Sequence, residues 1–145
     1  MPLPFTALAQ FIGDLLNRSG NTPAPRLQTT AEIGSYGERV AAAFLRRKGY
    51  RVLYRNFGTA RGEIDLVCRD RDMLVFVEVR TRADDQFGRP AETIGADKQE
   101  ALRYAARRYL EMLDDPNIRH RFDAVEVILR AGEVPVCTLQ PDLFA

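Results

Sequence analysis

The sequence predicts an α/β fold in which a central mixed β-sheet is flanked by helices. Its apolar pattern indicates the order helix, three strands, helix, two strands, which is typical of such a core. The chain has 145 residues, of which 46% are hydrophobic and 28% are charged, as in soluble globular domains. No apolar run is long enough to span a membrane. We therefore expect residues 31–145 to form one domain with its own core.

Residues 1–30 are predicted to be an appendage to this domain. Apolar residues at helical spacing predict a short amphipathic helix within residues 5–16, and SGNTPAP at 19–25 has the composition of a linker. No Lys or Arg precedes the apolar part, so the N-terminus makes a poor secretory signal. The cysteines Cys68 and Cys137 lie far apart and match no metal or redox motif. We therefore expect a cytoplasmic protein with two reduced thiols.

The first long helix is predicted to begin near Thr29. Thr29 and Glu32 have the spacing of a capping box, in which each side chain bonds the other residue's backbone. Apolar residues over 33–45 then form one stripe, and Gly49 after the RRK run is a typical helix stop. Glu38 falls on the flank of the stripe, so it can reach the edge of a neighbouring sheet.

Three strands are predicted next, over residues 50–57, 63–69 and 73–81. A two-residue turn at Arg71 and Asp72 joins the second strand to the third. The third strand, MLVFVEVRT, is so rich in apolar and β-branched residues that we place it at the centre of the sheet.

The remaining elements follow a loop over residues 82–95. Asp97, with Glu100 three residues later, is the predicted N-cap of a second long helix, which ends at DDPN. FDAVEVILR at 122–130 and EVPVCTLQ at 133–140 are predicted as the last two strands.

Acidic side chains interrupt the apolar strands of the predicted hairpin. Glu63, Asp65 and Val67 should share one face, because side chains in a strand alternate. A two-residue turn then places Asp65 opposite Glu78 and Glu63 opposite Arg80. Two like charges directly opposite each other destabilise a hairpin unless a cation lies between them.

A solvated face is the alternative, with a Glu63–Arg80 salt bridge and a hydrated Asp65. The core-like flanks IDLV and LVFVEV favour the cation. Carboxylates without a His or Cys partner suit a hard ion, Mg²⁺ or Mn²⁺, and the chain has one histidine, His120.

A basic stretch precedes these strands. Residues 38–61 contain seven Arg or Lys residues and one acid, and this imbalance indicates a candidate phosphate-facing surface. The RRK run alone could equally be a solvated helix face. Arg55 and Arg61 carry more weight, because they flank a loop beside the carboxylates.

GEIDLV and VFVEVRTR, preceded by GERVAAAFLRRKGYRVLYRNF, resemble the YraN-like family of endonuclease-like proteins over residues 34–130. That family is related to the archaeal Holliday-junction resolvases within the PD-(D/E)xK nuclease superfamily. The resemblance implies a restriction-endonuclease-like core and metal-dependent cleavage of DNA, including branched DNA. It also suggests a homodimer, since resolving a four-way junction calls for two sites.

The resemblance assigns roles to four residues of this chain. Asp65 matches the metal-binding aspartate, Glu78 the second acid, and Glu38 the acid of the first helix. Beside these matches, we expect the Val79 carbonyl as a further metal ligand. The lysine of the motif falls on Arg80. An arginine effectively cannot lose its proton, so Arg80 would stabilise the scissile phosphate rather than act as a base.

Lys98, in the first turn of the second long helix, is a candidate replacement for the missing lysine, although an ordinary exposed lysine is the commoner role. Gln99 could reach the site from the same turn. The predicted DNA-backbone contacts are Arg46, Arg47, Lys48, Arg55 and Arg61. Two rivals stay open: a non-catalytic nucleic-acid-binding protein that keeps the nuclease fold, and an interaction module whose carboxylates are structural.

Overall fold

The computed structural model describes residues 22–83, 94–115 and 117–144, and it confirms the α/β fold. The predicted helix within residues 5–16 and most of the predicted 82–95 loop lie outside the described residues. The described elements are listed here in chain order: α2 (Thr30–Arg47), β1 (Arg51–Gly58), β2 (Glu63–Asp70), β3 (Met73–Arg82), α3 (Ala96–Met112), β4 (His120–Ile128) and β5 (Val136–Gln140).

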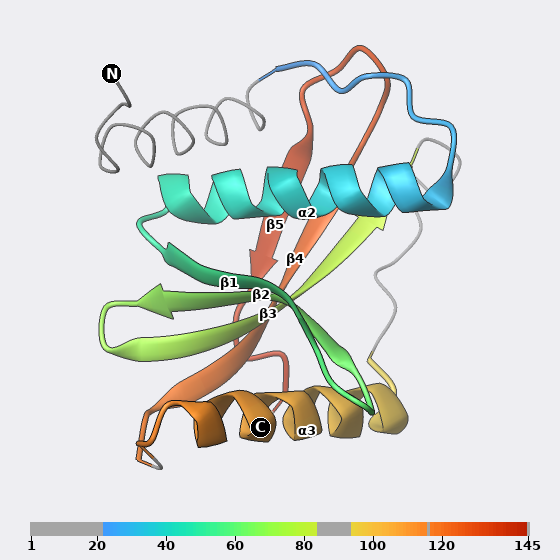
Figure 1. Ribbon diagram of the computed structural model, residues 1–145. Coiled ribbons are helices and arrows are strands. Elements are labelled where there is room, and N and C mark those ends of the chain that lie inside the picture. Colours follow the sequence, from blue (N-terminus) through green and yellow to red (C-terminus); the bar gives the residue numbers. More distant parts are fainter. Residues whose placement is uncertain (1–21, 84–93, 116, 145) are drawn as a thin grey trace, which may run out of the picture.

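The strands form one mixed sheet in the order β1-β2-β3-β4-β5, so β3 is central as predicted. β3 and β4 are parallel, and the other neighbours are antiparallel. Helix α2 covers one face of the sheet and α3 covers the other (Figure 1). In the part of the chain that the structure describes, neither helix is long and apolar enough to cross a membrane.

Alternation along β3 divides the core into two layers. Val75 and Val77 pack in the cluster under α2, whereas Leu74 and Phe76 pack in the cluster under α3. All four side chains are buried. A strand that is apolar on both faces belongs in the middle of a sheet covered on both sides, which is why the sequence predicted its position.

The ends of α2 follow from local sequence. The capping box is present, with Thr29 Oγ1 accepting from the Glu32 N–H at 3.1 Å and Glu32 Oε2 accepting from the Thr29 N–H at 3.2 Å. Gly49 after the helix has a φ of 95°, a conformation that glycine adopts without strain.

The start of α3 differs from the prediction. Gly95 is the N-cap, with extended backbone angles, and no side chain caps the helix. The Gly95 carbonyl accepts from the Gln99 N–H at 3.0 Å, which closes the first turn two residues earlier than expected. Asp97 therefore lies inside the first turn, where its charge is favourable to the helix dipole.

The last strands are also shifted from their predicted bounds. β4 begins at His120, because its parallel pairing with β3 already starts with Leu74 opposite His120. β5 begins only at Val136. Ahead of it, the Ala24 N–H donates to the Glu133 carbonyl at 2.7 Å, and the Gly132 N–H donates to the Ala24 carbonyl at 2.8 Å. The end of the predicted linker thus packs on the domain, with Ala24 buried.

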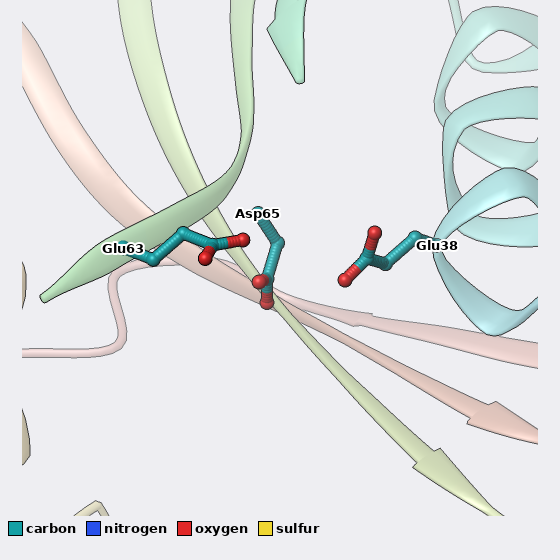
Figure 2. Close-up of side chains that lie close together, drawn as sticks. All are labelled: Glu38, Glu63 and Asp65. Carbon is teal, nitrogen blue, oxygen red and sulfur yellow. The ribbon is translucent and has the colours of Figure 1, made fainter. Parts of the chain in front are cut away.

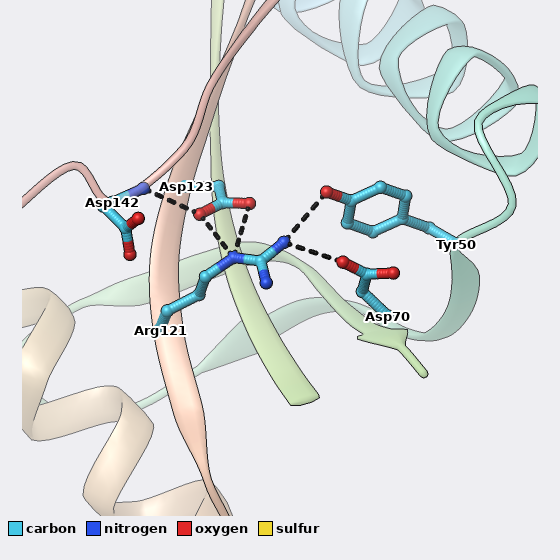
Figure 3. A network of polar contacts seen from close by, with 5 residues as sticks. All are labelled: Tyr50, Asp70, Arg121, Asp123 and Asp142. Atoms are coloured by element: carbon cyan, nitrogen blue, oxygen red, sulfur yellow. Dashed lines mark hydrogen bonds and ion pairs between the residues drawn. The ribbon is translucent and has the colours of Figure 1, made fainter. Parts of the chain in front are cut away.

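A partly buried polar network joins Tyr50, the residue before β1, to β2, β4 and the C-terminal segment at one end of the sheet (Figure 3). The Arg121 Nε donates to both carboxylate oxygens of Asp123, at 3.0 and 3.2 Å. Its Nη2 lies 2.9 Å from the Tyr50 hydroxyl and 3.1 Å from Asp70 Oδ2. Asp123, which is fully buried, also accepts from the Asp142 N–H at 3.0 Å.

We predict that Asp123→Ala lowers the free energy of unfolding by about 3 kcal/mol, because it leaves a partly buried guanidinium without its main partner and a backbone N–H without its acceptor. Urea unfolding measures the change. Asp72→Ala is the matched control, since it breaks an exposed pair with Arg119 (3.2 Å) and should cost less than about 1 kcal/mol. Equal losses in the two variants would contradict a structural role for the network.

Candidate metal centre

The candidate site lies where β2 and β3 separate. Their pairing runs from Asp70 opposite Met73 to Leu66 opposite Val77, which confirms the two-residue turn. Beyond that pair, the β1–β2 hairpin runs toward the start of α3, and the end of β3 runs toward the start of α2 (Figure 1). The Asp65 side chain bridges this fork, because its Oδ2 accepts from the Val79 N–H at 2.8 Å.

Strand β1 has an unusual backbone conformation at the residue that lies across from Asp65. Asn56 has a φ of 52° and lies between the Arg55–Leu66 and Phe57–Ile64 pairs, so it faces Asp65 along the ladder. On β2, Ile64 and Val67 both pack on the α3 side although they are three residues apart. Simple alternation is therefore interrupted at this point of the hairpin.

One prediction about the faces is wrong for this reason. Val67 packs in the layer under α3, whereas the carboxylates of Glu63 and Asp65 gather with that of Glu38 on α2 (Figure 2). The three β2 side chains do not share one face. Because the strands separate after the Leu66–Val77 pair, the β2–β3 pairing does not extend to the predicted pair of Glu63 and Arg80.

A close approach of α2 to β3 brings Glu38 to the site. Gly37 packs against the Thr81 side chain, and a Cβ on Gly37 would overlap Thr81. Gly62, just before Glu63, makes a similar approach to α3, where a Cβ would lie 3.0 Å from the Ala101 Cβ. Glycine beside each glutamate thus lets a helix and a strand meet closely.

Three carboxylates converge at this site. Each of Glu38, Glu63 and Asp65 offers an oxygen, and these oxygens lie within 4.8 Å of one another. Asn56 holds two of them: with its amide turned to satisfy both bonds, its nitrogen lies 3.0 Å from Glu38 Oε2 and 3.0 Å from Glu63 Oε1. Such a set of oxygen donors could hold a hard divalent cation.

Burial and the closeness of the other acids raise the pKa values of Asp65 and Glu38. Burial, followed by Glu78, raises the pKa of Asp65 to about 7, against the opposing effects of the Val79 hydrogen bond and Lys98. Burial and then Glu63 raise the pKa of Glu38. A cation between these groups would reverse both effects, because it favours the ionised carboxylates.

Glu78 and Lys98 lie at the edge of the cluster. Glu78 is close enough to raise the pKa of Asp65, and its Oε1 lies 3.3 Å from Lys98 Nζ. Its Oε2 is buried and has no hydrogen-bond partner among the residues that the structure describes. Lys98 therefore reaches the acidic site from α3, although its side chain is half exposed.

Val79 contributes its N–H to Asp65, and Arg80 lies half-buried on β3 with its Cα opposite Glu126.

The predicted nucleic-acid contacts divide between exposed and half-buried positions. Arg47 and Lys48 are exposed at the end of α2, whereas Arg46 and Arg55 are half-buried. Arg61, in the β1–β2 loop, lies over the Tyr104 ring at 4.9 Å from its centroid. Gln99 donates from its Nε2 to the Ile94 carbonyl at 3.0 Å.

Sequence reasoning did not assign two of the residues in the cluster. Glu63 was considered as a strand carboxylate but not as a metal ligand, because strict alternation paired it with Arg80. Asn56 was missed altogether. The available signal was an asparagine between two strand residues, since Asn tolerates a positive φ better than most side chains.

The comparisons with known proteins place this site inside a family. The model of the uncharacterised protein family UPF0102 matches residues 37–127, which include all four acids. A UPF0102 protein of Chlorobaculum tepidum is 45% identical over 96 residues, covering 66% of this chain and 74% of the relative. UPF0102 proteins of Syntrophomonas wolfei and Syntrophotalea carbinolica are 43% and 42% identical, covering 70% and 72% of this chain and 89% and 85% of theirs.

We predict that Asp65→Asn changes how stability depends on pH in metal-free protein. The folded-state pKa of Asp65, about 7, lies above its ordinary value of 3.8, so folded protein retains a proton that unfolded protein loses. The free energy of unfolding should therefore fall between these values as the pH rises, and less so in Asp65→Asn. Urea titrations with chelator at about pH 5 and about pH 8 measure this. Parallel pH dependence in the two proteins would contradict the raised pKa.

Gly37→Ala should separate α2 from β3 and move Glu38 out of the cluster. We expect it to lower the melting temperature and to weaken Mn²⁺ binding, measured by calorimetric titration. Gly34→Ala is the matched control, because a Cβ on Gly34 meets nothing within 4 Å. It should raise stability by about 0.5–1 kcal/mol through helix propensity and leave Mn²⁺ binding unchanged. The same Mn²⁺ affinity in both variants would show that this close approach does not position Glu38.

Proposed function

Since the chain belongs to the UPF0102 family, whose description assigns no activity, we propose its function from the acidic site: metal-dependent hydrolysis of phosphodiester bonds in DNA. One observation carries this proposal. Glu38, Glu63 and Asp65 come from a helix and a strand to within 4.8 Å of one another, at a fork in the sheet. The resemblance of GEIDLV and VFVEVRTR to the YraN-like branch of the PD-(D/E)xK nucleases supports the same activity.

The donor set fits Mg²⁺ or Mn²⁺. All candidate ligands are oxygens, Glu38 and Asp65 are half-buried with raised pKa values, and Asn56 already holds two of the carboxylates together. Glu38, Glu63 and Asp65 would hold the ion, and Glu78 with the Val79 carbonyl would complete the predicted set. Such an ion polarises a phosphoryl oxygen and lowers the pKa of bound water.

The surrounding cations would act on the substrate. Lys98 reaches Glu78 from α3 and would hold the attacking water or the leaving oxygen from there. Arg80, which stays charged, would stabilise the negative charge on the scissile phosphate. Exposed Arg47, Lys48 and Arg61 would contact the DNA backbone, and Gln99 would orient the first turn of α3 through its bond to Ile94.

A second function has its own support. Arg80 stands where the nuclease motif has a lysine, and Lys98, the other candidate, is paired with Glu78. Both features favour a nucleic-acid-binding protein that retains the nuclease fold and a metal site without hydrolysing its ligand.

Metal titration and a substrate panel test the proposal. We expect Mn²⁺ to raise the melting temperature of the wild-type protein, and to raise it much less in Asp65→Asn and Glu63→Gln. Glu133→Gln is the matched control, because Glu133 is an exposed acid at the β4–β5 connection. Equal shifts in all four proteins would refute the metal site.

Hydrolysis is measured on branched, nicked, single-stranded and duplex DNA with Mg²⁺ or Mn²⁺. The proposed activity predicts cleavage of at least one substrate by wild-type protein and none by Asp65→Asn. If the metal binds but every substrate stays intact, the binding function replaces the hydrolytic one.

A further inference from the structure

Two half-buried arginines, Arg46 and Arg55, lie near each other in the layer between α2 and the sheet, and Arg55 lies beside the acidic site. Arg55 is paired with Leu66, which packs in the cluster under α2, and residues paired in this way point to the same face. Arg46 lies in the last turn of α2. β1 is an edge strand of the described sheet, so this layer reaches the surface along β1.

Neither guanidinium is fully satisfied by the residues that the structure describes. The Nη1 atom of Arg46 and the Nε and Nη2 atoms of Arg55 are buried without a hydrogen-bond partner. In the described part of the chain, neither residue forms a salt bridge. Buried donors without partners are costly, and charged donors are the most costly of all.

The two cations also repel each other. Burial, and after it the charge of Arg55, lowers the pKa of Arg46. Cys68 lies nearby, but burial raises the pKa of its thiol to about 12, so it supplies no negative charge at neutral pH. Two adjacent guanidiniums with unused donors require an anion, and planar guanidinium groups match the oxygens of a phosphate.

We propose that Arg46 and Arg55 form a phosphate-binding site between the end of α2 and β1. The oxygens of one phosphate group would accept hydrogen bonds from their free donors, which would satisfy the buried N–H groups and place negative charge between the two guanidiniums. The group could belong to a phosphodiester backbone or to a terminal or free phosphate, since the oxygens available to the arginines are the same.

This site deepens the proposed function and rests on it for its biological ligand. Arg55 lies near enough to Glu38 to lower the pKa of that carboxyl, which places the two sites side by side. A nucleic acid with one phosphate at the acidic cluster would therefore present another phosphate to the arginines. The arginine pair would set the path of the strand across the α2 edge of the sheet.

The first test uses the wild-type protein without metal. The Arg55 Nε–H is buried, so its ¹⁵N resonance should be observable, and inorganic phosphate should shift it in a saturable titration while chloride at equal ionic strength does not. A short oligonucleotide without terminal phosphates should also shift it if a phosphodiester is the ligand. A response to phosphate alone would support a terminal or free phosphate. Equal responses to phosphate and chloride would overturn the site.

Variants test the same site by thermal unfolding. Arg46→Gln and Arg55→Gln should each weaken phosphate binding about tenfold or more, because each removes charge-assisted hydrogen bonds. Arg107→Gln on α3 is the matched control, because it removes the same charge from an exposed side chain of the helix that covers the other face of the sheet (Figure 1). Without phosphate, the two Gln variants should be at least as stable as wild type, because unsatisfied buried donors are removed. Clear destabilisation with unchanged phosphate binding would show that the arginines are structural.

Failure of this site and failure of the proposed hydrolysis are distinguishable. If wild-type protein binds phosphate through Arg46 and Arg55 but leaves every nucleic acid intact with Mn²⁺, the phosphate site stands without the activity. If it cleaves DNA and both Gln variants cleave at the wild-type rate and affinity, the phosphate site falls and the activity stands.

Discussion

The candidate site depends on the hydrogen bond from the Val79 N–H to Asp65, made where β2 and β3 separate. Up to Leu66 and Val77 the strands satisfy each other's backbone groups. Past that point β2 offers no backbone acceptor to the half-buried Val79 N–H. The Asp65 carboxylate accepts this hydrogen bond instead. The same bond holds a carboxylate in a half-buried position, where its charge is costly. This hydrogen bond thus lies where the β2–β3 pairing ends, and it holds a carboxylate at the candidate cation site.

Buried charges are paired with opposite charges at one end of the sheet and grouped with like charges at the other. At the end near the β2–β3 turn, Arg121 meets Asp123 and Asp70 together with the Tyr50 hydroxyl, so opposite charges and hydrogen bonds compensate within the protein. At the forked end, acids collect around Asp65, and next to them Arg55 forms a second like-charged group with Arg46 in the layer under α2. The first arrangement stabilises the fold without a ligand. The second is unfavourable by itself, and such sites are typical of places that bind ions or charged ligands.

Small residues and an unusual backbone position make the forked end possible. Gly37 and Gly62 allow α2 and α3 to approach the strands where a side chain would interfere, and each precedes a glutamate of the cluster. Asn56 adopts a positive φ opposite Asp65 and spans Glu38 and Glu63 with its amide. The acids are therefore positioned by neighbours that carry no charge, and the chemistry of the site depends on packing as much as on its ligands.

The sequence by itself determined the α/β class, the central place of β3, the two-residue turn and the capping box of α2, because these follow from local patterns and short-range hydrogen bonds. It also indicated that Glu38 would approach strands bearing Asp65 and Glu78. Only the tertiary structure decided that Glu63 joins the cluster, that Asn56 bridges it, and that Val67 turns away from Asp65. Those outcomes depend on where paired strands separate and how closely a helix can approach them. Both are set by the packing of distant segments, which strict alternation along one strand cannot reveal.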